Sequence, residues 1–307
     1  MSLPTHIPVL LNEATEGLQP RAGGCFVDCT VGLGGHAAAI LEKLSPSGKL
    51  LGIDADLEAL EIAEMKLGDY HEAVTLVNDN FANLEAICTE YHFHPVDGII
   101  FDLGVSSLQL DTARRGFSFQ HDATLDMRFA PRQELTASDI VNAFPEEKLA
   151  HILREYGEER QSQRLARLIV QSRPISTTTQ LARLVEQVLG SKHFRIHPAT
   201  RTFMALRIAV NNELQNLAAS LEQTIGLLHP GGRLVVISYH SLEDRIVKRF
   251  MYREAASCLC PPGALICRCG HIPTLKLISR KVIRPTSLEI KSNPRSRSAK
   301  LRIAERL

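Results

Sequence analysis

Long apolar runs are missing from this sequence, which argues against a membrane protein. A helix needs about 20 consecutive apolar residues to span a bilayer, and no segment of the 307 residues approaches that length. The first residues, MSLPTHIPVL, also lack the basic start and the small-residue cleavage site of a signal peptide. With 44% apolar and 22% charged residues, the composition is that of a globular protein. We therefore expect a cytoplasmic protein with no membrane partner.

The cysteines do not form the even set that a secreted disulfide framework requires. There are seven, and four of them fall between Cys258 and Cys269 in the pattern C-x-C…C-x-C, with His271 nearby. Thiols grouped in this way could hold a structural zinc ion, although the single residue inside each pair is fewer than the usual two to four. The alternative is a flexible loop. We expect no metal at the reaction centre.

The chain as a whole has little net charge, +1, but positive and negative residues are unevenly distributed along it. Lys276–Leu307 contains ten Lys or Arg and two Glu, which gives +8 and leaves −7 for residues 1–275. A basic segment of this kind suits a polyanion. A solvated charged surface would give the same count.

The most informative segment is Val27–His36, with the sequence VDCTVGLGGH. An apolar run meets Asp28, a loop with three glycines follows, and Ala37–Leu44 has the apolar spacing of an amphipathic helix. Glycines let the backbone take positive φ or lie directly against a ligand, and the N–H groups that open a helix favour an electron-rich or anionic group. The segment predicts a strand, a ligand-binding loop and a helix, although a loop that only joins the two elements would look the same.

Apolar strands alternate with helices in the first part of the chain, which predicts a doubly wound parallel sheet. The middle of the chain has helical patterns only, so we predict a Rossmann-like α/β domain over residues 1–107 and 213–307 and an inserted all-helical domain over residues 108–212. A further strand and a closing pair of strands would complete a seven-stranded, mostly parallel sheet. The expected strands are Cys25–Val27, Lys49–Ile53, Val74–Val77, Gly98–Leu103, Arg233–Ser238, Leu275–Ile283 and Ala299–Ala304.

Three side chains at predicted strand ends indicate a cofactor that contains a ribose. Asp54 ends the second strand, 22 residues after Gly32, where an acid accepts hydrogen bonds from ribose hydroxyls; a cap on the next helix is the alternative. Phe81 follows the third strand and could pack on an adenine or belong to the core. Asp102 ends the fourth strand, beside the expected reaction centre. Nicotinamide, flavin and S-adenosylmethionine enzymes share this arrangement, and the closing strand pair favours a methyltransferase.

The sequence resembles the bacterial family of ribosomal RNA small-subunit methyltransferase H, formerly called MraW. The resemblance rests on HIPVLLNE, VDCTVGLGGHAAAIL, DLGVSSLQLD, RGFSF, LDMR, HPATRTFMALRIAVNNEL, PGGRLVVISYHSLEDRIVK and NPRSRSAKLR, which together span nearly the whole chain. Met204 departs from the glutamine expected there. The resemblance implies a class I methyltransferase that modifies the N4 amine of a cytidine in the decoding region of 16S ribosomal RNA. The donor would be S-adenosylmethionine and the partner 16S rRNA or the small subunit, while a homodimer is left open.

The resemblance also assigns residues to the cofactor and the inserted domain to substrate recognition. The cofactor residues are Gly34, Gly35 and His36 at the methionine part, Asp54 at the ribose, Phe81 at the adenine, and Asp102 and Gln109. Asp102 is also the expected catalytic residue, because an acceptor there would draw the cytosine amine toward tetrahedral geometry. The motif DLGVSS offers no aromatic side chain, so the target base must stack on a residue from elsewhere. Candidates are Phe117, Phe119 and Tyr239.

Two other functions fit parts of the sequence. Tyr239, His240 and Ser241 suggest a hydrolase triad, but adjacent residues rarely converge on one point and the nucleophile elbow G-x-S-x-G is absent. A non-catalytic RNA-binding assembly factor with a decayed cofactor pocket would share the fold. The intact glycines and the acids at Asp54 and Asp102 favour the enzyme.

Overall fold

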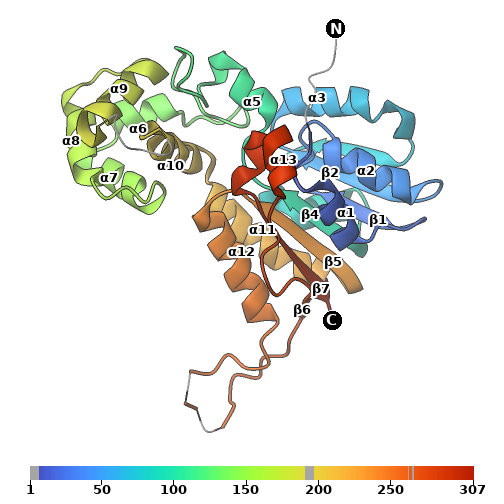
Figure 1. The fold of residues 1–307 in the computed structure, drawn as a ribbon. Helices are drawn as coiled ribbons and strands as arrows, with labels where there is room; N and C mark the ends of the chain where they lie inside the picture. Colours follow the sequence, from blue (N-terminus) through green and yellow to red (C-terminus); the bar gives the residue numbers. More distant parts are fainter. Residues whose placement is uncertain (1–6, 191–196, 262, 265) are drawn as a thin grey trace. The chain divides into compact units, whose positions relative to one another are not determined.

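The computed structural model describes residues 7–190, 197–261, 263–264 and 266–307 (Figure 1). They form two compact units, of which unit 1 comprises Met1–Gly104 and Leu214–Leu307 and unit 2 comprises Val105–Glu213. Within the described ranges, no helix combines the length and the apolarity that a bilayer crossing requires.

Unit 1 is built on a seven-stranded sheet with the order β3-β2-β1-β4-β5-β7-β6. The first five strands are parallel to their neighbours, and β7 runs antiparallel to both β5 and β6. This arrangement confirms the predicted Rossmann-like, mostly parallel sheet. Its direction of growth reverses between β1 and β4, which is where open α/β sheets bind their ligands. The strands are β1 Cys25–Asp28, β2 Lys49–Asp54, β3 Val74–Asn78, β4 Val96–Asp102, β5 Leu228–Ser238, β6 Leu275–Leu277 and β7 Lys300–Arg306.

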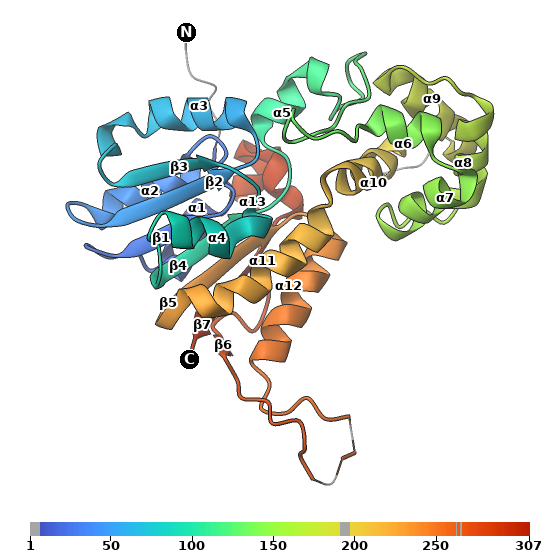
Figure 2. The ribbon, with the colours of Figure 1, turned by 180° about the vertical axis from the view of Figure 1, so that it is seen from behind.

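Helices cover both faces of the sheet, which explains why the central strands are apolar throughout. Successive side chains of β4 alternate between the faces: Ile99 and Phe101 join one buried cluster with α4, α11 and α12, whereas Ile100 joins another with α1, α2 and α3. Figure 2 shows α4 and α11 in front of the sheet. The helices are α1 Leu11–Leu18, α2 Gly35–Leu44, α3 Leu57–Lys66, α4 Leu84–Glu90, α11 Glu213–Leu227 and α12 Ser241–Glu254.

The basic segment Lys276–Leu307 is part of this sheet and not a free tail. It contains most of β6, all of β7, and between them α13 (Ser287–Ser292), which Thr286 caps by accepting the N–H of Glu289. Several of its cations are paired, since Lys276 Nζ lies 3.6 Å from a Glu305 oxygen and Arg302 Nε 2.8 Å from Asp244 Oδ1. Part of the +8 excess therefore stabilises the fold itself.

Unit 2 has a hydrophobic core of its own, made of residues between Phe117 and Val210. Capping boxes begin three of its helices: Ser106 starts α5, Thr136 starts α6 and Thr177 starts α9, each accepting the N–H three residues later. A single bridge between Thr124 and Thr177 is the extent of β-pairing in the described part of this unit. Its helices are α5 Ser107–Asp111, α6 Ala137–Ala143, α7 Glu146–Glu155, α8 Ser162–Gln171, α9 Thr178–Leu189 and α10 Ala199–Asn211.

Candidate active site at the carboxyl ends of the strands

The loop after β1 connects the ends of β1 and β4, the two strands between which the strand order of the sheet reverses (the switch point). The backbone N–H of Thr30 donates to Asp28 Oδ1 at 3.0 Å, and the Thr30 hydroxyl accepts the backbone N–H of Asp102 at 2.6 Å. Asp28 is buried, and its hydrogen bond with Thr30 fixes its carboxyl group at the start of the glycine loop. The bond from Asp102 to Thr30 joins the end of β4 to the loop after β1, in addition to the backbone hydrogen bonds between the two strands.

The glycine loop has one open position and two packed ones. Gly32 adopts φ +50°, and a Cβ built there would meet nothing nearer than the Thr30 carbonyl oxygen at 3.8 Å. A Cβ at Gly34, where φ is +75°, would instead lie 3.3 Å from Leu67, and one at Gly35 would overlap Pro8. The missing side chains of Gly34 and Gly35 therefore make room for protein atoms. Gly32 is the position whose bare backbone faces open space.

Asp54 is oriented by the glycine loop, which lies 22 residues earlier in the chain. Its Oδ2 accepts the N–H of Gly32 at 2.8 Å, and its Oδ1 accepts the N–H of Asp56 at 2.9 Å. The cap of α3 is Asp56, which accepts the N–H of Glu58, so Asp54 is not needed for that task. Desolvation by burial raises the pKa of Asp54 to about 6, although the two N–H groups act against this shift. Its carboxylate is thus positioned for a further partner.

Asp102 forms the centre of a polar cluster at the end of β4. The hydroxyl of Tyr239 donates to its Oδ1 at 2.8 Å, and the Tyr239 backbone N–H donates to Glu243 Oε2 at 2.9 Å. His36 Nδ1 lies 3.6 Å from Asp102 Oδ2. Because the carbonyl oxygen of Val9 can only accept, His36 Nε2 carries the hydrogen of their 3.1 Å bond. In the neutral ring, Nδ1 therefore presents a lone pair toward Asp102.

Acidic groups dominate the electrostatics of this cluster. Desolvation is the main cause that raises the pKa of both Asp28 and Asp102 to about 7. The hydrogen bond from the Tyr239 hydroxyl opposes the rise in the pKa of Asp102. The negative charges of Asp102 and Asp54 raise the pKa of Asp28 further. Burial lowers the pKa of His36. Carboxyl groups crowded into one desolvated site favour a cationic ligand over an anionic one.

Phe81 lies in the turn after β3 and belongs partly to the core. Its ring meets Phe101 edge to face, with 5.7 Å between the centroids, and it packs on the buried cluster of β4 while staying half-buried. Asn80 shapes the turn by accepting the N–H of Ala82 at 2.8 Å. Both the core and the adenine interpretations are compatible with this position.

The other candidates belong to unit 2. Gln109 is buried and completes a capping box in which its Oε1 accepts the N–H of Ser106 at 3.0 Å. Phe117 stacks on Phe129 with 5.6 Å between the centroids. Phe119 lies against His197 and Phe203, with its ring centroid 4.5 and 5.0 Å from theirs. Both phenylalanines therefore pack inside unit 2, which favours a structural role for them and leaves Tyr239 as the aromatic candidate within unit 1.

Two residues of the cluster did not follow from the sequence pattern. Asp28 and Thr30 connect the strand ends, but neither was predicted as a site residue. The available signal is an acid and a threonine directly after an apolar strand and before a glycine loop. Both side chains accept hydrogen bonds from backbone N–H groups of unit 1. A motif search for catalytic residues does not detect such contacts.

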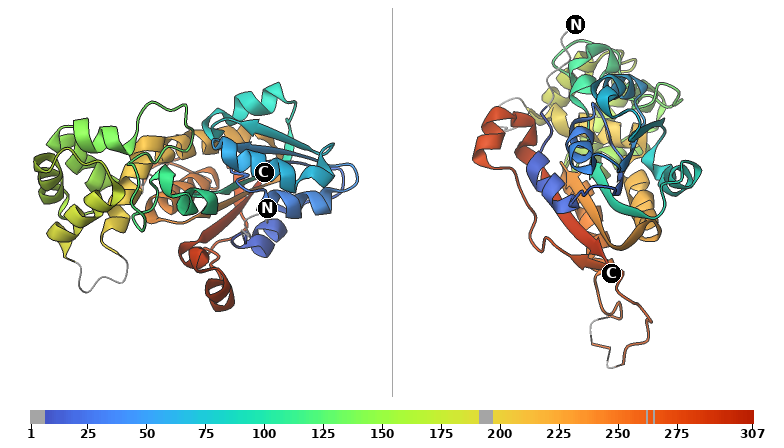
Figure 3. Two further views of the ribbon diagram at one scale, coloured as in Figure 1. Left: turned by 90° about the horizontal axis from the view of Figure 1, so that it is seen from above. Right: turned by 90° about the vertical axis from the view of Figure 1, so that its right-hand side faces the viewer.

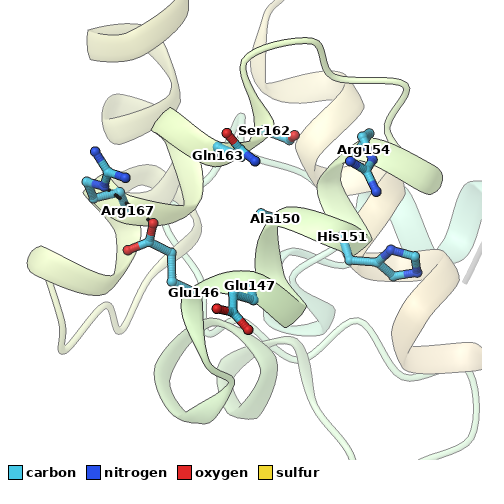
Figure 4. Close-up of a pocket in the computed structure, with 8 residues that line it drawn as sticks. All are labelled: Glu146, Glu147, Ala150, His151, Arg154, Ser162, Gln163 and Arg167. Carbon is cyan, nitrogen blue, oxygen red and sulfur yellow. Dashed lines mark hydrogen bonds and ion pairs between the residues drawn. The ribbon is translucent and has the colours of Figure 1, made fainter.

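A pocket of about 260 Å³ lies between α7 and α8 of unit 2 and shares no residue with this cluster (Figure 4). The residues that line it carry charges of both signs, and two of them form an ion pair in which Arg167 Nε lies 3.3 Å from Glu146 Oε1. Because these charges compensate one another, the pocket lacks the one-sided acidity found at the end of β4.

Comparisons with known proteins cover the whole chain. A family model described as the MraW methylase family matches residues 4–307. Proteins named ribosomal RNA small subunit methyltransferase H are similar over nearly their full length. The one from Dehalococcoides mccartyi strain BAV1 is 56% identical over 98% of this chain and 86% of its own length. The one from Thermomicrobium roseum is 54% identical over 99% of this chain and 94% of its own.

Proposed function

The chain belongs to the MraW methylase family, and from this premise we propose that it transfers a methyl group from S-adenosylmethionine to small-subunit ribosomal RNA. The acceptor is the N4 amine of a cytidine in 16S rRNA. The observation that carries the proposal is the Asp102 cluster, which joins an acidic acceptor, a tyrosine hydroxyl and a histidine lone pair at the sheet's switch point. An RNA of the ribosome as substrate would place the activity in the cytoplasm.

The residues of unit 1 fit S-adenosylmethionine, which supplies an electrophilic methyl group on a positively charged sulfur. Asp54 is aimed by Gly32 and can accept hydrogen bonds from two ribose hydroxyls. The open space over Gly32 allows a ligand to approach the backbone. The desolvated acids Asp28 and Asp102 favour its cationic sulfur and ammonium groups. Phe81 offers an aromatic edge or face for the adenine.

Asp102 acts on the attacking amine. The N4 lone pair of cytosine is delocalised into the ring, so an acceptor that binds an N4 hydrogen helps the nitrogen to become tetrahedral. Tyr239 holds one carboxylate oxygen of Asp102 in place, which leaves the other oxygen for the amine. The methylated nitrogen is acidic enough to release a proton afterwards. Asp102 and His36 Nδ1, 3.6 Å apart, can take up and share that proton.

Recognition of the RNA requires groups beyond this cluster. A base in folded RNA must be splayed out of its stack to reach such a pocket. We assign the surrounding backbone contacts to unit 2 and to the exposed cations of Lys276–Leu307, such as Arg295 and Arg297.

The test is nucleoside mass spectrometry of small-subunit RNA incubated with the protein and isotopically labelled S-adenosylmethionine. We expect the label in N4-methylcytidine. The competing function, an RNA-binding assembly factor without catalysis, predicts no label and no S-adenosylmethionine binding in calorimetry. Cofactor binding with a label on another base would keep the methyltransferase and reject its cytosine specificity.

A further inference from the structure

The loop between α12 and β6, residues 255–274, projects away from the sheet of unit 1 (Figure 3). Its stem is closed by Thr274, whose backbone N–H donates to the Glu254 carbonyl oxygen at 2.8 Å and whose hydroxyl donates to a Glu254 carboxylate oxygen at 2.6 Å. Connections of this length without regular structure are uncommon in compact domains unless they serve a function.

Apolar packing does not hold the outer part of this loop. Leu259, Ile266 and Ile272 are 45%, 69% and 76% exposed. Burial of apolar surface is the usual source of stability for a folded segment, and here these side chains provide little of it. Another interaction must fix the loop if it is to have one conformation.

Four cysteine sulfurs meet in that part of the loop, two from each arm. The Sγ of Cys258 is 3.4 Å from that of Cys267 and 3.8 Å from that of Cys269. Cys267 Sγ is 4.0 Å from Cys260 Sγ and 3.5 Å from Cys269 Sγ. All four sulfurs lie within 4.8 Å of one another. A zinc ion with bonds of about 2.3 Å to four thiolates needs sulfurs about 3.8 Å apart, at the corners of a tetrahedron.

Backbone N–H groups surround the same sulfurs. The N–H of Leu259 lies 3.3 Å from Cys269 Sγ, that of Cys260 lies 3.4 Å from Cys258 Sγ, and that of Arg268 lies 3.4 Å from Cys260 Sγ. Donors of this kind stabilise negative charge on sulfur and orient metal ligands. The tight C-x-C spacing is thus compatible with four convergent sulfurs, because N–H groups from each arm reach sulfurs of the other.

We propose that Cys258, Cys260, Cys267 and Cys269 bind one zinc ion, which closes the loop into a small knuckle at the end of the α12–β6 connection. This site lies apart from the aspartate cluster and has a structural role. Two disulfides are the main alternative, but a disulfide needs sulfurs about 2 Å apart, and all the measured separations here are longer. Four thiolates exclude hard cations such as magnesium and favour zinc or iron.

The experiment measures metal in the full-length protein, purified without chelators or nickel resin. Plasma mass spectrometry should find about one zinc per chain. Cys258→Ser/Cys267→Ser removes one ligand from each arm and should lower the content at least tenfold. Cys25→Ser, which removes a thiol from β1, is the matched control and should keep its zinc.

Cobalt titration of the reduced, metal-free wild type tests the same geometry without any variant. It should give the thiolate-to-cobalt charge-transfer and visible bands of a tetrahedral four-sulfur site. No zinc in the wild type together with no such bands would overturn the proposal, as would iron in place of zinc. Thiol titration of the denatured chain without reductant should find all seven cysteines; four missing thiols would identify two disulfides and also reject the site.

Discussion

The contact between Tyr239 and Asp102 provides the sharpest test of the proposed chemistry. The Tyr239 hydroxyl donates to the Asp102 carboxylate at 2.8 Å and opposes the effect of burial, and the net pKa of Asp102 is raised to about 7. Tyr239→Phe removes this donor while keeping the ring. A hydrogen bond to a charged group contributes about 1.5–3 kcal/mol, which corresponds to roughly 1–2 pKa units. The pKa of Asp102 should therefore rise to about 8–9 in the variant.

The raised pKa of Asp102 should change the turnover rate in a predictable direction and by a predictable amount. If Asp102 acts as an ionised acceptor, activity is lost as the pH falls through its pKa, so a raised pKa moves the profile toward alkaline pH. At pH 7.5 the ionised fraction falls from about three quarters to between about one quarter and a few hundredths. Turnover at saturating S-adenosylmethionine and RNA should then drop about 3- to 25-fold and return to within about twofold of wild type at pH 9.

The assay is the initial rate of methyl transfer from labelled donor, measured from pH 6 to 9 for the wild type, Tyr239→Phe and a control. Tyr252→Phe is the control, because it removes a hydroxyl of the same unit whose partner among the described residues is the Arg280 carbonyl oxygen, at 3.4 Å. Its profile should match that of the wild type. A uniform loss in Tyr239→Phe without any alkaline shift would refute the reasoning, since the hydroxyl would then act on something other than the ionisation of Asp102.

Three further predictions concern the cofactor, the acceptor and the RNA. Asp54→Ala should weaken S-adenosylmethionine binding by about 1–3 kcal/mol, because the ribose hydroxyls lose a charged acceptor; unchanged affinity in calorimetry would exclude that contact. At saturating cofactor, Asp102→Asn keeps an acceptor oxygen and should retain partial turnover, whereas Asp102→Ala should lose far more. Equal losses in the two variants would reject the acceptor role. Replacing the exposed Arg295 and Arg297 with Gln should reduce the salt slope of RNA binding by roughly 2, and an unaltered slope would assign both to solvated surface.

The strands were predictable because their signal is local. Buried parallel strands need continuous apolar runs, and Lys49–Asp54 has one that ends at the predicted residue. The helix α12 was missed for an equally physical reason. Its sequence SLEDRIVKRFMYRE is rich in charge, and it buries Glu243 and Glu254 together with Val247 and Phe250. Polar residues on the buried face hide the apolar periodicity from which a helix is predicted.

That the glycine loop and Asp54 belong together was indicated by their spacing, but the contacts around Asp102 were not predictable. Gly32 and Asp54 are joined through a motif whose separation along the chain carries information. The bonds from Asp102 to Thr30 and Tyr239 link residues 72 and 137 positions apart. No short pattern encodes such pairs, because they arise only when distant strands align in the sheet. The zinc site lies between these cases: its residues are visible in the sequence, and the convergence of their sulfurs is visible only in the folded loop.

The position of β4 in the sheet has a consequence for how the chain is made. β4 pairs with β1 on one side and with β5 on the other, yet all of unit 2 separates β4 from β5 along the chain. On the ribosome, β4 therefore waits with one edge unpaired, and Phe101 without its cover from α11 and α12, while unit 2 emerges and folds around its own core. Unpaired strand edges and exposed apolar surfaces promote aggregation. A chain that stops before β5 should consequently depend on chaperones, whereas unit 2 already contains a complete hydrophobic cluster of its own.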